Sequence, residues 1–216
     1  MVMVATGVEL MIDTPTRRAL LRAGGLGAAG GLGAGVFAAG SMLAIGRSVA
    51  QTPLAATPAC HDGNEATLAQ TEGPYFKPSS PERVKLLEEG MAGQPIELVG
   101  FVLTRGCKPL AGALLEFWQA DDKGRYDNAG FRLRGHQFTD AEGRYRLRSI
   151  VPGVYPGRTR HIHVKVQPPG GRILTTQLYF PGEAQNRSDG LFRKELLVRT
   201  AKNAGALAGR FDFVVG

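Results

Sequence analysis

The chain has 216 residues, enough for one domain of ordinary size and too few for two large ones. It is 43% hydrophobic and 21% charged with a net charge of +7, which is the composition of a folded protein. Two cysteines exclude a disulfide scaffold and a four-cysteine zinc site. Because the basic residues are interspersed with acidic ones and form no run of five, we expect no nucleic-acid partner.

Residues 1–50 have the pattern of an export signal. Thr16 to Arg22 read TRRALLR, an apolar Gly/Ala-rich stretch follows from Ala23 to Ile45, and Ser48-Val49-Ala50 gives the small-x-small ending of a cleavage site. The paired arginines are similar to a twin-arginine signal. A membrane anchor is the alternative, but the many glycines of the apolar stretch favour cleavage. We therefore expect export by the twin-arginine translocase, to the periplasm or outside the cell.

Residues 51–94 are mixed in character and predict an irregular N-terminal segment with one short helix around Pro81–Glu89. In an oxidising compartment, Cys60 and Cys107 could form a single disulfide or remain two buried thiols. The sequence does not favour one of these alternatives over the other.

Residues 95–216 predict a second region, in which short strand-like runs alternate with turn signals about every ten residues. Seven or eight such strands with Gly/Pro turns are typical of an all-β fold, a two-sheet β-sandwich. The clearest runs are Ile96–Leu103, Ala113–Trp118, Tyr145–Arg148, Ile162–Val166, Leu174–Phe180 and Phe211–Val215.

The sequence His161-Ile162-His163 lies on one of these predicted strands. Alternation places both imidazoles on one face, with Ile162 on the opposite, core-facing side. Two such histidines can bind one metal ion together, although surface histidines are the simpler interpretation of the spacing alone. The chain has only four histidines, which favours the metal site a little.

The nearby residue types narrow the choice of metal. No carboxylate or cysteine occurs between Tyr145 and Phe180, which argues against a two-His-one-carboxylate iron(II) site and against blue copper. Tyr155 precedes the histidines by six residues, and Tyr126 follows a turn at Asp121–Arg125. Phenolate and imidazole donors together fit Fe(III) better than Zn(II) or Cu(I). Each tyrosine alone is more simply an amphipathic rim residue.

Five ordered segments closely resemble the intradiol ring-cleavage dioxygenases, the family of the protocatechuate 3,4- and catechol 1,2-dioxygenases. The resemblance covers about residues 71–183 and implies a prealbumin-like two-sheet β-sandwich that carries the catalytic site. The segments are Thr71–Tyr75 (TEGPY), Phe117-Trp118 through Gly124-Arg125-Tyr126, Thr139–Tyr145 (TDAEGRY), Pro152–His163 (PGVYPGRTRHIH) and Thr175–Phe180 (TTQLYF).

The resemblance also implies the metal and its ligands. The family binds a non-haem Fe(III) through two tyrosines and two histidines, which match Tyr126, Tyr155, His161 and His163. It cleaves a catechol-type ring with O2 to a cis,cis-muconate-type dicarboxylate and needs no external reductant. Tyr155 is also expected among the catalytic residues, because one tyrosinate leaves to make room for the catechol.

The resemblance further implies the residues that meet the substrate. Arg158 matches the family arginine that stabilises developing negative charge, and Gln177 matches the glutamine that supports the same pocket. Tyr179 matches a pocket residue, with strand packing as the alternative. The segment between Tyr155 and the histidines is shorter than in well-known members, so Arg160 is the alternative pocket arginine. Lys77, Arg132 and Arg134 are candidates to meet a substrate carboxylate, with surface solvation the simpler role for each.

Two other interpretations remain. The turn segments at Lys108–Ala113 and Thr139–Tyr145 also resemble non-catalytic exported sandwich modules, which would make this a binding protein. A copper or zinc protein with two histidine ligands is the other alternative. Neither accounts for the ordered Tyr155, Arg158 and Gln177 around the histidines.

Overall fold

The computed structural model describes residues 65–203 and 205–216. The predicted export signal at 1–50 and Cys60 lie outside these residues. None of the helices that the described residues form is long and apolar enough to cross a membrane. The elements are β1 (Pro95–Thr104), β2 (Leu114–Trp118), β3 (Arg134–Phe138), β4 (Arg144–Ile150), β5 (His161–Gln167), β6 (Leu174–Tyr179), the 3₁₀ helices η1 (Ala184–Arg187) and η2 (Lys194–Leu196), β7 (Arg199–Asn203), β8 (Ala206–Arg210) and β9 (Phe213–Val215).

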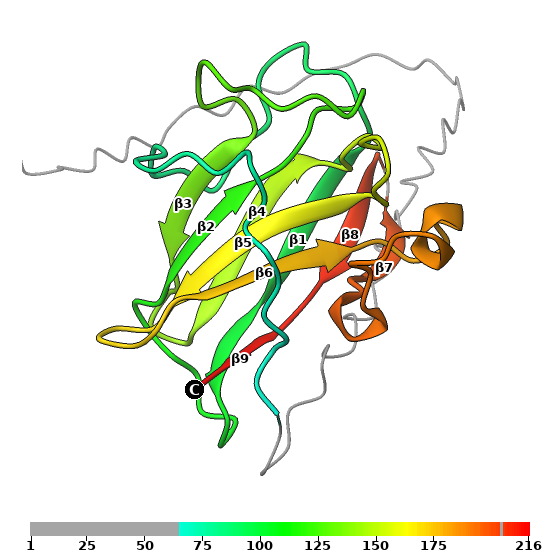
Figure 1. The fold of residues 1–216 in the computed structure, drawn as a ribbon. Coiled ribbons are helices and arrows are strands. Elements are labelled where there is room, and N and C mark those ends of the chain that lie inside the picture. The colour runs from blue at the N-terminus through cyan, green and yellow to red at the C-terminus, as the bar shows by residue number, and fades with distance from the viewer. Residues whose placement is uncertain (1–64, 204) are drawn as a thin grey trace, which may run out of the picture. The chain divides into compact units, whose positions relative to one another are not determined.

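The strands form two sheets, which face each other as two layers in Figure 1. One sheet has the order β3-β2-β5-β6, and all its neighbours are antiparallel. The other has the order β4-β1-β8-β7, and β9 pairs with the end of β1 that follows the β8 pairing. The predicted all-β, two-sheet sandwich is confirmed.

Alternation of side chains along the strands builds the core between the sheets. In β4, Tyr145 and Leu147 are buried while the three arginines that alternate with them are exposed. Ile162 and Val164 of β5 are fully buried against the same core, as predicted. Strands with one apolar and one polar face are expected where a sheet has a buried side and a covered or solvated side.

The helix predicted around Pro81–Glu89 is wrong. This segment is extended and bridges the two sheets: His136 N on β3 donates to Pro81 O, and Arg148 N on β4 donates to Val84 O. Arg83 N and Leu86 N return hydrogen bonds to the same two strands, and Leu86 is fully buried. Pairing with two sheet edges and burial of Leu86 outweigh the helix propensity of the charged run.

The strand prediction also differs in number, since the described residues contain nine strands. β3, β7 and β8 are not among the predicted runs, and the last strand begins at Phe213 rather than Phe211. Cys107, in the turn after β1, is disulfide-bonded.

An N-terminal segment, residues 65–76, covers the outer face of β5 and β6, and Figure 1 shows it crossing in front of these strands. Gln70 N donates to Thr175 O, and Thr176 Oγ1 donates to Leu68 O. The side chain of Gln177 is tied to the same segment, because its Nε2 donates to Thr71 O. The outer face of β5 and β6 around Gln177 is therefore covered by this segment.

Candidate functional site

A row of buried side chains crosses the outer face of the sheet β3-β2-β5-β6. The strand register pairs Arg134 with Trp118, Trp118 with His163, and His163 with Gln177. All four residues are buried. Cross-strand partners in adjacent strands lie side by side on one face, so the register alone brings these four together. His161 lies on the same face, opposite Tyr179.

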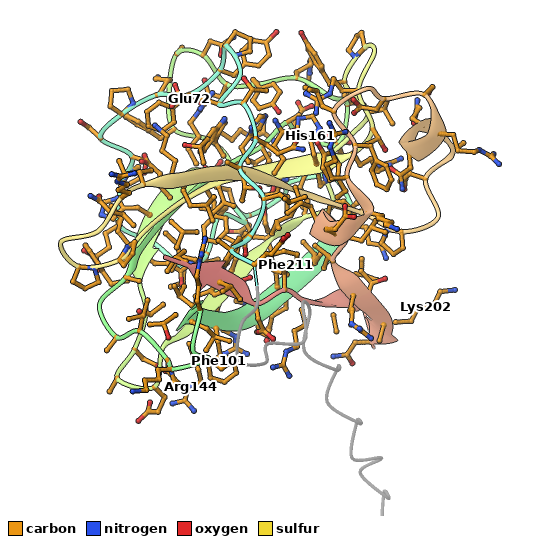
Figure 2. The ribbon with its side chains drawn as sticks, turned by 60° about the horizontal axis from the view of Figure 1, so that its bottom comes forward. Glu72, Phe101, Arg144, His161, Lys202 and Phe211 are labelled. Atoms are coloured by element: carbon orange, nitrogen blue, oxygen red, sulfur yellow. The ribbon has the colours of Figure 1, made fainter. Side chains whose placement is uncertain are left out.

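The two histidines point their Nε2 atoms at each other, 3.1 Å apart. His161 Nδ1 lies 2.6 Å from Thr159 O, a contact in which the ring donates and Nε2 keeps its lone pair. The imidazole of His163 stacks on Trp118 with ring centroids 4.8 Å apart. In Figure 2, His161 lies on the side of the sandwich opposite Arg144 and Phe101.

Burial keeps both imidazoles neutral. Desolvation is the main cause that lowers the pKa of His161, to about 4, and the positive charge of Arg158 lowers it further. Desolvation also lowers the pKa of His163 well below the usual range, followed by the effects of His161 and Arg158. Neutral imidazole is the form that binds a metal ion.

Tyr126 brings a phenol to this pair, with its hydroxyl 3.3 Å from His161 Nε2. The preceding turn is fixed by Asp121, whose Oδ1 accepts from the backbone N–H of Lys123 and of Arg125. Burial raises the pKa of Tyr126, although Arg158 and Arg134 act in the opposite direction. The phenol is therefore neutral at ordinary pH unless a strongly acidic cation binds to it.

Tyr155 lies edge-on to Tyr126, with ring centroids 6.1 Å apart. Two glycines let the segments that carry these tyrosines approach: a Cβ on Gly124 would lie 2.0 Å from Val154 O, and one on Gly153 would lie 2.4 Å from Asp122 O. Backbone contact this close leaves room for no other residue. The segments are joined by Gly153 N, which donates to Asp121 O at 2.7 Å.

Arg158 is held beside the row of buried side chains by groups from two further segments. Its Nη2 donates to Gln177 Oε1 at 2.6 Å and lies 3.4 Å from the Tyr179 hydroxyl. Its Nε donates to the carboxylate of Asp189 at 2.9 Å. The structure thus brings Arg158, Gln177 and Tyr179 together.

Arg160, the alternative pocket arginine, lies elsewhere. Its Nε donates to Glu183 and its Nη1 donates to Pro152 O. Within the part of the chain that the structure describes, Arg160 forms no hydrogen bond with Gln177 or Tyr179. The geometry therefore favours Arg158 over Arg160 as the arginine of the site.

Three residues of the site have contacts that sequence reasoning did not predict. The Tyr75 hydroxyl is hydrogen-bonded to that of Tyr155 at 2.8 Å, and its ring stacks on Tyr126 with centroids 4.4 Å apart. The TEGPY segment pointed to Tyr75 only as part of a motif. Trp118 lies on the same strand face as the histidines by register, a signal that strand pairing alone provides. Asp189 follows η1 and has no comparable signal in the sequence.

The interpretation of Arg134 as a solvated surface residue is wrong. Arg134 is 1% exposed, its Nη1 donates to Tyr75 O and its Nε donates to Asp127 O. Lys77 donates to the carbonyls of Ala129 and Gly130. Both side chains therefore organise the backbone around Tyr75 and Tyr126.

The structure brings the phenol of Tyr126 to the two imidazoles, and Tyr155 lies beside Tyr126. Among residues 65–203 and 205–216, no group of three or more His, Cys, Asp and Glu side chains is arranged to hold a metal ion. The phenols are thus the donors that complete any site built on the two histidines. Hard phenolate oxygen with imidazole suits a small, highly charged cation.

Comparison with known proteins gives the family of this chain. The model of the family Dioxygenase_C, described as Dioxygenase, matches residues 71–215. The protocatechuate 3,4-dioxygenase beta chain of Burkholderia cepacia is 36% identical over 152 residues, which cover 57% of this chain and 65% of that protein. The hydroxyquinol 1,2-dioxygenase of Rhodococcus opacus is 32% identical over 168 residues, which cover 66% of this chain and 55% of that protein. The chain therefore spans between about half and two thirds of the length of these relatives.

Solved structures agree as well. The dioxygenase domain of a dioxygenase carbohydrate-binding protein fusion from the cellulolytic bacterium Streptomyces sp. SirexAA-E is 56% identical. It matches with a TM-score of 0.69 and covers 70% of this chain and 98% of that chain. The family model spans more than half of the present sequence, including every residue of the tyrosine–histidine site. This chain belongs to the intradiol dioxygenase family.

Proposed function

We propose that this chain is a non-haem Fe(III)-dependent dioxygenase that cleaves a catechol-type ring with O2 to a cis,cis-muconate-type dicarboxylate. The observation that carries the proposal is the grouping of Tyr126 with the two histidines, next to an arginine held in place by buried partners. His161 Nε2 lies 3.3 Å from the Tyr126 hydroxyl and 3.1 Å from His163 Nε2.

The residues present fit Fe(III). Both imidazoles are neutral and buried, and the His161 ring is oriented by Thr159 O. Two phenols supply anionic oxygen once a strongly acidic cation displaces their protons. We propose that Tyr126, Tyr155, His161 and His163 hold the iron. When bound, Fe(III) supplies Lewis-acid chemistry and a template that orients the two catechol oxygens.

The chain's own residues supply charge and orientation around the catechol. Arg158 provides a fixed positive charge where the ring becomes anionic, and Gln177 and Tyr179 fix its guanidinium. The Tyr75 hydroxyl is hydrogen-bonded to that of Tyr155, which gives this phenol a partner beside the site. The covering segment, residues 65–76, limits water around the buried row.

The test is a visible absorption spectrum of the purified protein with an iron assay, before and after catechol is added. Tyrosinate bound to Fe(III) gives a burgundy charge-transfer band, and we expect one iron per chain and a shift to longer wavelength with catechol. His163→Ala is expected to remove both iron and colour. A protein that stays colourless after iron reconstitution would overturn the proposal and favour the non-catalytic sandwich.

We also propose that the protein is exported by the twin-arginine route. The proposal is supported by the TRRALLR segment and by the disulfide at Cys107, a bond that is typical of oxidising compartments. Replacing Arg17 and Arg18 with lysine is expected to leave the protein in the cytoplasmic fraction. Unchanged fractionation would contradict this route.

A further inference from the structure

The carboxylate of Asp189 faces the Nε edge of the Arg158 guanidinium. The Asp189 side chain is 2% exposed, and that of Arg158 is 18% exposed. Arg158 Nε lies 2.9 Å from Oδ2 and 3.1 Å from Oδ1 of the carboxylate. A carboxylate this deeply buried is stable only when hydrogen bonds and a positive charge compensate it.

Each carboxylate oxygen of Asp189 accepts a backbone hydrogen bond as well. Thr159 N donates to Oδ2 and Leu191 N donates to Oδ1, each at 2.9 Å. Burial alone would raise the pKa of Asp189, but the hydrogen bonds from Leu191, Thr159 and Arg158 outweigh it and hold the pKa below its usual range. The group is therefore a carboxylate, with both oxygens fully used.

The loop that carries Asp189 is fastened to the segment that carries Arg158. Thr159 Oγ1 donates to Asn186 Oδ1 at 2.7 Å, and Asn186 Nδ2 donates to Phe180 O at 2.9 Å. Asp189 N donates to Gln185 O, and Phe192 N donates to Asp189 O. The carboxylate thus has a fixed position relative to the end of β6 and the start of β5.

On the far side of the guanidinium, Nη2 donates to Gln177 Oε1 at 2.6 Å. Gln177 Oε1 is also 3.1 Å from the Tyr179 hydroxyl, and Gln177 Nε2 is committed to Thr71 O. The Arg158 side chain is therefore held at both ends, by Asp189 at Nε and by Gln177 at Nη2. A planar guanidinium fixed at two edges has one orientation.

We propose that Asp189 is a positioning residue for the reaction, which acts by fixing the orientation of Arg158 and touches neither substrate nor metal. The inference rests on the proposed function, because it assigns Asp189 through the arginine that faces the catechol. Electrostatic stabilisation depends on a charge that is already in place when the ring becomes anionic. Loss of about 1 Å in position can cost a hundredfold in rate.

The central variant is Asp189→Asn, with Glu183→Gln as the matched control. Asparagine has one carbonyl oxygen and one NH2 group, and the NH2 group would replace a carboxylate oxygen that faces Arg158 Nε and a backbone N–H. Asparagine therefore cannot accept all of the hydrogen bonds that Asp189 accepts. Glu183 is on the same loop and forms the corresponding ion pair with Arg160 at 3.0 Å. Both variants lose one acid–arginine pair, but only one of those arginines contacts Gln177.

For the iron-loaded full chain with catechol and O2, we expect Asp189→Asn to lower kcat by about ten- to a hundredfold. Iron content and the charge-transfer band stay as in the wild type, and Glu183→Gln stays within about twofold of it. Arg158→Ala combined with Asp189→Asn is expected to be no slower than Arg158→Ala alone, because Asp189 acts through Arg158. Full kcat in Asp189→Asn, or multiplying losses in the double variant, would overturn the inference.

A second readout does not depend on activity. In the full chain labelled with ¹⁵N-arginine and free of metal, the Arg158 Nε–H signal is assigned by its loss in Arg158→Ala. We expect slow solvent exchange of this proton in the wild type and in Glu183→Gln, and fast exchange in Asp189→Asn. Fast exchange in the wild type would overturn the inference. Slow exchange in a wild type that cleaves no catechol would instead contradict the proposed function and leave the role of Asp189 in holding Arg158 supported.

Discussion

Tyr155 lies in the loop between β4 and β5 and is held at the site by other aromatic side chains. Its hydroxyl lies 2.8 Å from that of Tyr75, and both Tyr75 and Tyr126 lie edge-on to its ring. The hydrogen bond with Tyr155 is the main cause that raises the pKa of Tyr75, so Tyr75 stays protonated and available as a donor. Tyr155 is therefore a proposed ligand whose hydroxyl already has a hydrogen-bond partner outside the proposed ligand set.

Tyr155→Phe removes this phenol and keeps the ring. We expect ring cleavage to fall by at least about a hundredfold, because one anionic donor is lost, and the charge-transfer band to weaken and shift. Tyr145→Phe is the matched control: Tyr145 OH donates to Phe211 O at 2.8 Å in the core. This control is expected to cost about 1 kcal/mol of stability and to leave the spectrum unchanged. A Tyr155→Phe protein with full activity would show that the ligand assignment is wrong.

The residues of the site were predictable to different degrees. Strand alternation places His161 and His163 on one face without any further information. Tyr126 and Tyr155 were candidates from residue type and position, but their assignment as ligands required the family resemblance. Arg158 and Gln177 were found through the resemblance alone. Asp189 was not predicted, since a buried carboxylate that fixes an arginine from another loop depends on tertiary contacts alone.

At the scale of elements, the turns at Asp121 and Asp140 have the same hydrogen-bond pattern but lie in different parts of the molecule. Asp121 accepts from Lys123 N, Arg125 N and Arg125 Nε. Asp140 accepts in the same way from Glu142 N, Arg144 N and Arg144 Nε. The first turn leads directly into Tyr126. The second joins β3 to β4, and Figure 2 places its Arg144 on the side of the molecule opposite His161.

Asp121→Ala leaves two backbone N–H groups of the first turn without their acceptor. We expect a stability loss of about 1–3 kcal/mol and about tenfold weaker iron retention, measured by chelator competition. Asp140→Ala makes the same change in an exposed turn, so it should cost less stability and leave iron retention unchanged. Equal loss of iron in both variants would show that the turn does not position Tyr126.

The dependence of folding stability on acidic pH follows from the same carboxylate, that of Asp121. Burial alone would raise the pKa of Asp121, but hydrogen bonds from Arg125 and Lys123 hold it below its usual range. A lowered pKa means that the stabilisation is present above the unfolded value of about 4 and is lost as the pH falls through the folded value. The stability difference between wild type and Asp121→Ala should therefore shrink below about pH 4 in denaturant titrations. A difference that stays constant down to pH 2 would contradict it.

Strands in which buried and exposed residues alternate clearly were predictable from the sequence. Strands that form mainly through backbone pairing with their neighbours were not. β4 alternates strictly between arginines and buried residues, so its pattern is visible in the sequence. β3 reads RGHQF, in which Phe138 is the single residue that favours a strand, and β8 reads ALAGR, which has no β-branched or aromatic residue. The segment 81–89 has a helical composition but lies between the edges of both sheets, where backbone pairing decides its conformation.

At the scale of the whole molecule, the two sheets have different structural roles. The sheet β3-β2-β5-β6 carries the histidines and is covered by residues 65–76, whereas the sheet around β1 closes the core. The closure occurs where the C-terminal chain leaves β8 and enters β9 alongside β1. There Phe211 N donates to Val99 O, and Phe101 N donates to Asp212 Oδ1.

Gly100 makes this closure possible, because a Cβ at this position would lie 1.8 Å from Phe211 O and 2.9 Å from Tyr145 Cε1. We expect Gly100→Ala to lower the free energy of unfolding by about 3 kcal/mol or more, since the backbone must move in β1 or in the connection between β8 and β9. Gly106→Ala, in the turn that follows β1, meets only Thr104 Oγ1 at 3.8 Å and should stay within about 0.5 kcal/mol of the wild type. Because the site lies on the other sheet, the folded fraction of Gly100→Ala should keep its iron and its charge-transfer band, and denaturant unfolding monitored at that band separates the two effects. A folded Gly100→Ala protein without iron would show instead that the two sheets cannot be treated as separate in function.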